Sequence, residues 1–152
     1  MQERLNRESR SDLLRFTLAT MPTFRPADFH RRYYQCLTKF ATGEIKKLMV
    51  FMPPQHGKSE GSTRRLPAFL LGQDPEKRLA IVSYNAPKAR KFNREIQRII
   101  DTPEYHAIFP GTCLNASNVT TIAGSWLRNA DECEIVRHRG GFKTVGVGGA
   151  LT

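Results

Sequence analysis

Apolar side chains recur every three or four positions in several stretches of this chain, a spacing typical of amphipathic helices. It predicts four helices, over residues 11–20, 27–42, 58–71 and 86–101. Ser11 or Asp12 is suited to cap the first helix, Gly43 to end the second, and Asn85 to cap the fourth. Pro67 lies inside the third helix, where we expect a kink.

Other apolar runs have the length and composition of strands. Residues 46–52 (KKLMVFM) and 78–84 (RLAIVSY) are short, apolar and bounded by turn residues, which indicates buried strands of a parallel sheet. The helical periodicity disappears after residue 103. Short strands separated by Gly, Asn and Asp turns are predicted there, over residues 118–124, 125–129, 133–138 and 142–149. The order strand, loop, helix, strand, helix predicts an α/β fold.

The charge is large and unevenly distributed. The net charge is +10; residues 1–100 carry 20 Lys and Arg against 9 Asp and Glu, whereas residues 101–152 carry 4 against 5. This asymmetry suggests a polyanionic partner, most simply nucleic acid, although a basic surface that only keeps the protein soluble gives the same count. On the predicted helix 86–101, a basic arc lies opposite the apolar one, formed by Arg90, Lys91, Arg94 and Arg98. This arc faces either DNA phosphates or solvent.

The remaining composition argues against several classes of protein. Cys36, Cys113 and Cys133 are scattered and form no CxxC pair, so we expect free thiols and neither a zinc site nor a disulfide scaffold. No run of about 18 apolar residues is present, so a membrane span is not expected. The charged N-terminus lacks the apolar run of a secretory signal, so we expect the protein not to be secreted.

The stretch VFMPPQHGKSEG, residues 50–61, contains the clearest chemical signal. It follows a predicted strand and opens a predicted helix, which is the setting in which backbone N–H groups bind phosphate. Gly57 lets the backbone approach a phosphate, Lys58 reaches the β- and γ-phosphates, and the Ser59 hydroxyl ligates Mg²⁺. Met52 stands where such loops usually begin with glycine. The plainer alternative is an ordinary turn between a strand and a helix.

A P-loop ATPase also needs an acidic residue at the end of another apolar strand. The candidates are Asp101, which closes a helix, and the pair Asp131 and Glu132, which follows polar residues. Neither has the required context, so the sequence predicts a nucleotide loop without a catalytic acidic partner.

The nonapeptide MPPQHGKSE (52–60) resembles the divergent phosphate loop of the large terminase subunit of tailed bacteriophages, in which two prolines and HGKSE replace the glycine-rich start. The similarity extends from about residue 26 to residue 152. It includes FHRRYYQCLTKFATGEIKKLMVFM before the loop, the basic helix after it, and the TVGVGGALT ending. In that family, the glycine-rich ending comes shortly before a strand that finishes in paired acids, and this sequence stops just short of them.

The resemblance implies a partial P-loop NTPase of the RecA/ASCE type: a parallel sheet with flanking helices and short β-strands in the C-terminal third. Residues 1–44 would be a helical lead-in, and residues 45–152 an incomplete ATPase core without the acidic motif and the nuclease domain. The complete relative is an ATPase and endonuclease of the bacterial host cytoplasm. It uses ATP and Mg²⁺ to drive double-stranded viral DNA through a portal protein, with a small terminase subunit and other copies of itself as partners.

The resemblance also assigns roles to individual residues. Lys58 would be the catalytic residue and Ser59 the Mg²⁺ ligand. The loop that binds ATP would consist of Pro54, Gln55, His56, Gly57, Lys58 and Ser59. Gln35 is a candidate for adenine recognition, or simply a solvent-facing glutamine. Relatives often carry arginine where this chain has Gln55, so a role in charge stabilisation does not carry over to this position. The basic arc would face DNA or a neighbouring motor subunit.

Two other interpretations remain open at the level of sequence. In the first, the chain is a helicase-type P-loop fragment, which should continue toward a DEAD-type acidic motif. In the second, it is a non-catalytic basic module that binds nucleic acid. A nucleotide-binding measurement separates the second interpretation from the terminase one, because in a non-catalytic module Lys58→Ala would change nothing.

Overall fold

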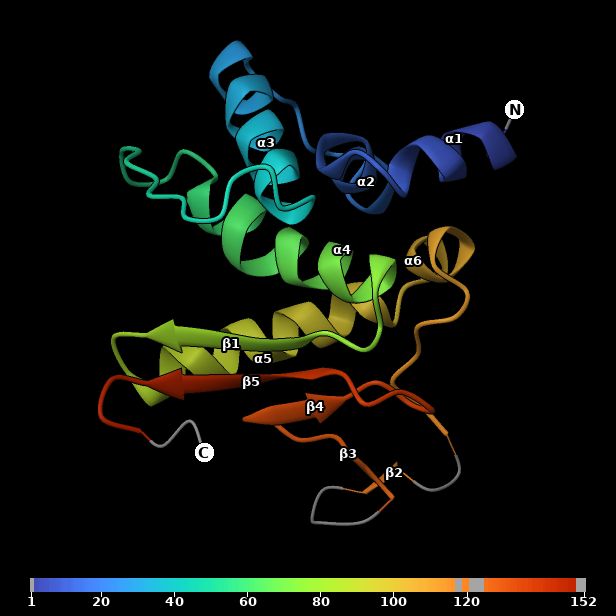
Figure 1. Ribbon diagram of the computed structural model, residues 1–152. Coiled ribbons are helices and arrows are strands. Elements are labelled where there is room, and N and C mark those ends of the chain that lie inside the picture. The colour runs from blue at the N-terminus through green and yellow to red at the C-terminus, as the bar shows by residue number, and fades with distance from the viewer. Residues whose placement is uncertain (1, 117–118, 121–124, 150–152) are drawn as a thin grey trace.

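The computed structural model describes residues 2–116, 119–120 and 125–149, and it is a mixed α/β fold. The helices are α1 (Gln2–Ser9), α2 (Leu13–Thr20), α3 (Asp28–Ala41), the π-helix η1 (Glu60–Arg65), α4 (Leu66–Gln73), α5 (Ala86–Ile100) and α6 (Pro103–Ile108). The strands are β1 (Arg78–Ser83), β2 (Val119–Thr120), β3 (Trp126–Leu127), β4 (Glu132–Glu134) and β5 (Gly141–Gly146). Figure 1 shows α1 to α4 on one side of the sheet edge formed by β1, with α5 along one face of the sheet.

The main sheet is small and mixed. Its strand order is β1-β5-β4, with β1 parallel to β5 and β4 antiparallel to β5, while β2 and β3 form a separate parallel pair. The purely parallel sheet expected from the sequence is therefore corrected to a mixed one. The predicted strand 142–149 corresponds to β5, which is the central strand because it pairs with both neighbours. Of the predicted strand 118–124, residues 118 and 121–124 lie outside the described residues.

Three of the four predicted helices are confirmed with their caps or ends. The Asp12 side chain accepts a hydrogen bond of 2.8 Å from the Arg15 backbone N–H at the start of α2, and Asn85 accepts one of 2.9 Å from Lys88 at the start of α5. Gly43, just past α3, has a left-handed φ of 82°. Helices α1 and α6 were not predicted, because α1 (QERLNRES) has only one apolar side chain and α6 has only 6 residues, so neither shows an apolar period.

The strand predicted over residues 46–52 is absent from the structure, and this expectation was wrong. From Leu48 to Met52 the burial alternates: Leu48, Val50 and Met52 pack against the core, whereas Met49 and Phe51 are 79% and 85% exposed. This alternation is that of a strand with one face on the core. A β-strand also requires a hydrogen-bonded neighbour, and none of the described strands pairs with this segment.

The helix predicted over residues 58–71 forms, but its first part has an unexpected geometry. Residues 60–65 are a π-helix, in which the Leu66 N–H donates to the carbonyl of Gly61 five positions earlier. Proline within an α-helix clashes with the carbonyl four residues before it. The wider π turn lies immediately before Pro67 and gives its ring more room. The kink expected at Pro67 stays a prediction.

One hydrophobic core joins the N-terminal helices to the rest of the molecule. Phe16 of α2 is fully buried, and its ring centroid lies 5.5 Å from Phe69, 5.9 Å from Tyr105 and 5.8 Å from Phe109. The core thus includes side chains from both of the ranges 1–44 and 45–152. The division into two domains at residue 44 stays a prediction.

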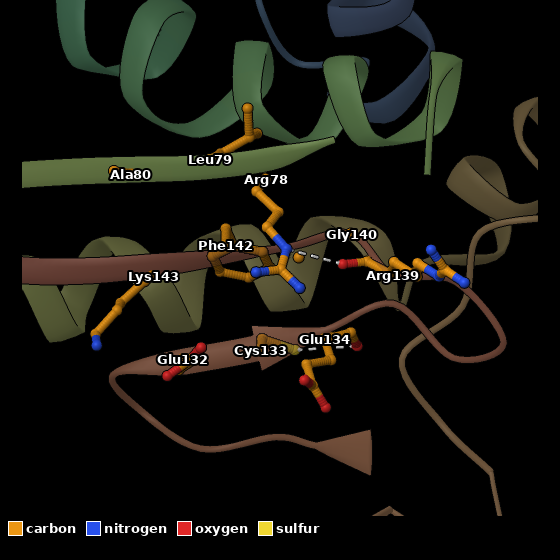
Figure 2. Close-up of a pocket in the computed structure, with 11 residues that line it drawn as sticks. Arg78, Leu79, Ala80, Glu132, Cys133, Glu134, Arg139, Gly140, Phe142 and Lys143 are labelled. Atoms are coloured by element: carbon orange, nitrogen blue, oxygen red, sulfur yellow. Dashed lines mark hydrogen bonds between the residues drawn. The ribbon is translucent and has the colours of Figure 1, made fainter. Parts of the chain in front are cut away.

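Among the described residues, a helix covers one face of the main sheet and not the other. Helix α5 packs on the face that carries Phe142 and Thr144, and the Asn93 amide donates a hydrogen bond of 3.2 Å to the Thr144 hydroxyl. The opposite face carries a cavity of about 310 Å³, lined by charged side chains such as Glu132 and Lys143 (Figure 2). Towards the C-terminal ends of β1 and β5, Val82 is left exposed.

Candidate functional site: a phosphate-binding loop

The loop between residues 53 and 57 contains two residues in the left-handed backbone region. Gln55 and Gly57 both adopt left-handed φ values, of 62° and 74°, and the helix begins at the next residue, Lys58. Alternating left-handed residues turn successive backbone N–H groups toward one point, which forms a concavity that attracts anions. The adjoining helix N-terminus adds its positive end to the same place.

Helix α3 supports this loop from behind. The Tyr33 hydroxyl donates a hydrogen bond of 2.7 Å to the Lys58 carbonyl, and Nε2 of His30 lies 3.2 Å from the His56 carbonyl oxygen. Burial raises the pKa of Tyr33, so the hydroxyl stays protonated and able to donate. The sequence analysis did not anticipate that the Tyr33 hydroxyl and the His30 ring of α3 contact the loop.

Close packing against α3 explains the glycines on either side of Lys58. A Cβ at Gly57 would lie 3.1 Å from Nε2 of His30, and one at Gly61 would lie 2.7 Å from Cε1 of Tyr33. At 61 an added Cβ would overlap the Tyr33 ring, whereas at 57 the left-handed φ of 74° is the main reason for glycine.

The Lys58 side chain folds back over the loop. Its Nζ lies 3.5 Å from the Met52 carbonyl oxygen, at the outer limit of a hydrogen bond, so this contact is weak and easily exchanged for a phosphate. Lys58 also lines a cavity of about 380 Å³ together with residues 50–53. The Lys58 side chain is exposed and lies over residues 50–53, just before the loop.

Among the described residues, Mg²⁺ would find few ligands. Ser59 lies half-buried in the first helical turn, but the structure groups no three His, Cys, Asp or Glu side chains in a metal-binding cluster within the described ranges. Asp101 is ion-paired with Arg128, and Asp131 with Arg90 at 2.7 Å. Of the loop residues, Ser59 is the one whose hydroxyl a cation at the helix start would meet.

An aromatic group beside the loop was not anticipated as part of the site. The Phe29 ring centroid lies 5.8 Å from that of His56 and 4.0 Å from that of His30, and the Phe29 side chain is 43% exposed. Gln35, the sequence's candidate for adenine, is exposed on α3 about 200° around the helix from Tyr33. The loop therefore lies next to Phe29 and on the other side of α3 from Gln35.

Of the four cations in the basic arc on α5, one is neutralised by an ion pair. Arg90 is ion-paired with Asp131, whose hydrogen bond and charge raise the pKa of Arg90. Lys91, Arg94 and Arg98 are exposed, and within the described part of the chain they have no ion-pair partner. Three uncompensated cations at positions i, i+3 and i+7 form a stripe along one side of the helix.

Comparison with protein-family models, with curated proteins and with solved structures finds no match for this chain. A search of the described helices for one long and apolar enough to cross a membrane finds none.

Proposed function

We propose that residues 54–59 bind the triphosphate of ATP and that the chain belongs to a DNA-packaging ATPase of the large terminase type. The observation that carries the proposal is the pair of left-handed residues, Gln55 and Gly57, directly before Lys58 at a helix N-terminus. The proposal is supported by what such a loop offers a polyphosphate: backbone N–H groups, the positive end of a helix and a neighbouring lysine.

Each residue of the loop has a distinct part in this proposal. The backbone of Pro54 to Gly57 wraps the phosphates, Lys58 neutralises them, and the Ser59 hydroxyl contributes one ligand to the accompanying Mg²⁺. The exposed ring of Phe29 offers the base a surface on which to stack. The proposal covers nucleotide binding, because hydrolysis needs a further carboxylate that positions Mg²⁺ and water.

Double-stranded DNA is the partner that we propose for the basic stripe of α5, formed by Lys91, Arg94 and Arg98. Its three cations are exposed and lie on one side of a rigid helix, as contacts to a phosphate backbone require. By the resemblance, the complete machine would assemble from several copies, with a portal protein and a small terminase subunit, in the cytoplasm of the bacterial host.

The test is titration of the protein with a fluorescent ATP analogue in the presence of Mg²⁺, for the unmodified chain and for Lys58→Ala. A charged hydrogen bond contributes about 1.5–3 kcal/mol, so we expect Lys58→Ala to weaken binding by about tenfold or more. Lys47→Ala is the matched control, because Lys47 is an exposed lysine outside the loop, and its affinity should equal that of the unmodified chain.

The proposal fails if the unmodified chain does not bind the analogue. It also fails if Lys58→Ala and Lys47→Ala bind equally well, since the binding would then depend on overall charge and not on the loop.

A further inference from the structure

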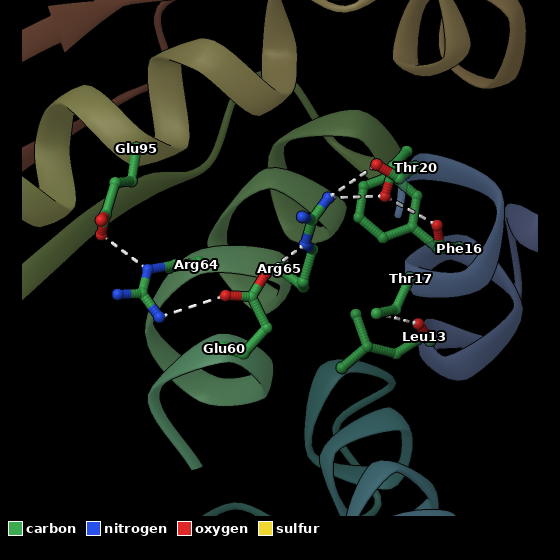
Figure 3. A network of polar contacts seen from close by, with 8 residues as sticks. All are labelled: Leu13, Phe16, Thr17, Thr20, Glu60, Arg64, Arg65 and Glu95. Atoms are coloured by element: carbon green, nitrogen blue, oxygen red, sulfur yellow. Dashed lines mark hydrogen bonds and ion pairs between the residues drawn. The ribbon is translucent and has the colours of Figure 1, made fainter. Parts of the chain in front are cut away.

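The residue that follows Ser59 is held by two consecutive arginines. Glu60 accepts a hydrogen bond of 3.1 Å from Nη1 of Arg64 and one of 2.7 Å from Nε of Arg65, one on each carboxylate oxygen (Figure 3). The Glu60 side chain is only 19% exposed and that of Arg65 only 10%, so these are partly buried ion pairs. Such pairs are sensitive to the loss of either partner.

The π-helix is what allows both arginines to reach the same carboxylate. Residues four apart are neighbours on an α-helix, whereas residues five apart point in different directions. A π-helix forms its hydrogen bonds between residues five apart, as from Leu66 to Gly61 here, so residue 65 returns to the side of residue 60. The Glu60–Arg65 pair and the π geometry therefore depend on each other.

Both arginines are also attached to other helices. Arg65 donates through Nη1 to the Thr20 hydroxyl of α2 at 2.8 Å and to the Thr20 carbonyl at 3.3 Å. Arg64 donates through Nε to Glu95 of α5 at 2.6 Å, and its Cζ lies 5.5 Å from the centroid of the Phe92 ring. Figure 3 shows this chain of contacts from α5 through η1 to α2.

The charges of this network balance, two carboxylates against two guanidinium groups. Burial disfavours the charge of Arg64, but the hydrogen bond and charge of Glu95, with the charge of Glu60, outweigh it and raise the pKa of Arg64. The network holds the first turns of the helix between α5 on one side and α2 on the other.

We propose that Glu60 is a positioning residue for the nucleotide site: it holds the turn after the loop in the π geometry that directs Lys58 and Ser59 toward the phosphates and Mg²⁺. This inference rests on the proposed function. Each residue of a helix is rotated by about 100° from the last, so a change of register by one residue would turn both side chains away from a ligand at the loop. Outer residues that orient direct ligands commonly contribute about 10–100-fold to affinity.

The experiment compares Glu60→Gln with Glu95→Gln. Glu95 is a matched control, because it is 20% exposed, it also pairs with Arg64, and it lies outside the helix that follows the loop. Each variant removes one carboxylate from the same network, so both should lower the melting temperature. We expect Glu60→Gln alone to weaken the binding of the fluorescent ATP analogue with Mg²⁺, by about tenfold, and Glu95→Gln to change it less than about twofold.

A second readout separates positioning from general loss of stability. The affinity for the analogue is measured with Mg²⁺ and with EDTA. The ratio of the first affinity to the second reports how well Ser59 and the phosphates coordinate the ion together. Glu60→Gln should lower this ratio, and Glu95→Gln should preserve it. If Glu60→Gln does not fold, Arg65→Lys replaces it. Arg65→Lys keeps the positive charge but cannot contact Glu60 and Thr20 at the same time through a planar guanidinium group. It should therefore cause the same loss of affinity.

Equal losses in Glu60→Gln and Glu95→Gln, or no loss with Glu60→Gln or its substitute, would overturn the inference while leaving the proposed function intact. An unmodified chain that binds no nucleotide overturns the proposed function and the inference with it. Lys58→Ala distinguishes the two cases, because it tests the loop without touching the network.

Discussion

At the scale of single residues, Gln55 has a strained backbone conformation at the candidate site. A residue other than glycine with a left-handed φ of 62° is strained by about 1–3 kcal/mol, and such strain is concentrated at functional sites. The strain is compensated by the supports around the loop, chiefly the contacts from His30 and Tyr33. The amide side chain of Gln55 adds no charge, so the positive charge in the loop comes from Lys58.

The identity of the residue that receives the base can be decided by substitution. We predict that Phe29→Ala weakens binding of the ATP analogue by about fivefold to a hundredfold, because stacking of one base contributes about 1–3 kcal/mol. Gln35→Ala, on the other side of α3, should leave affinity unchanged. Inorganic tripolyphosphate, which has no base, serves as the control. Its affinity, measured by competition, should be the same for the unmodified chain, Phe29→Ala and Gln35→Ala. A loss with Gln35→Ala and none with Phe29→Ala would restore the adenine role that the sequence suggested for Gln35.

At the scale of elements, the same kind of pattern succeeded in α5 and failed in residues 46–52. Helix α5 satisfies its backbone hydrogen bonds internally, so its cap at Asn85 and its apolar arc are sufficient to predict it. An extended segment needs a partner strand, and its apolar alternation says nothing about whether one is present. The π-helix was equally hidden, because it depends on contacts of Arg64 and Arg65 with other helices.

The basic stripe of α5 makes a prediction about salt. Each phosphate contact contributes about −0.9 to the slope of log K against log salt concentration, so replacing Lys91, Arg94 and Arg98 by Gln should flatten the slope for duplex DNA by about 2.7. The matched control replaces Arg31, Arg32 and Lys39, three exposed cations of α3, by Gln. It removes the same charge from another helix. Equal flattening in both triple variants would show that net charge and not the stripe binds DNA.

At the scale of the whole molecule, the helices before residue 44 and the sheet share one core. We predict that Phe16→Ala lowers the free energy of unfolding by about 3–5 kcal/mol, because it leaves a cavity among three aromatic rings. That is a large share of the about 5–15 kcal/mol typical of a domain. The single tryptophan, Trp126 of β3, reports on the strand region, so its fluorescence during urea unfolding is the measurement.

The prediction distinguishes one cooperative unit from two. In a single unit the Trp126 transition moves to lower urea together with the far-ultraviolet circular dichroism. A Trp126 midpoint that stays in place while helical signal is lost would instead support a separate lead-in over residues 1–44. Leu5→Ala is the control, because Leu5 of α1 is an exposed apolar side chain whose removal creates no cavity.

The sequence by itself determined those features whose interactions are local. Helices α2, α3 and α5, the caps at Asp12 and Asn85, and the strand character of β1 and β5 follow from spacing and from neighbouring residues. The candidate loop is likewise a local pattern, because Gly57, Lys58 and Ser59 are adjacent in the chain, and its binding of phosphate stays a prediction. In each case the partners lie within a few positions of one another.

Only the tertiary structure decided which distant residues meet. It placed β5 in the centre of a mixed sheet, left residues 46–52 without a strand partner among those described, and put Phe29 beside His56. It also joined Glu60 to α2 and α5 through two arginines. These outcomes depend on packing between segments far apart in the chain, and the free energy of that packing is not encoded in the apolar period of any one segment.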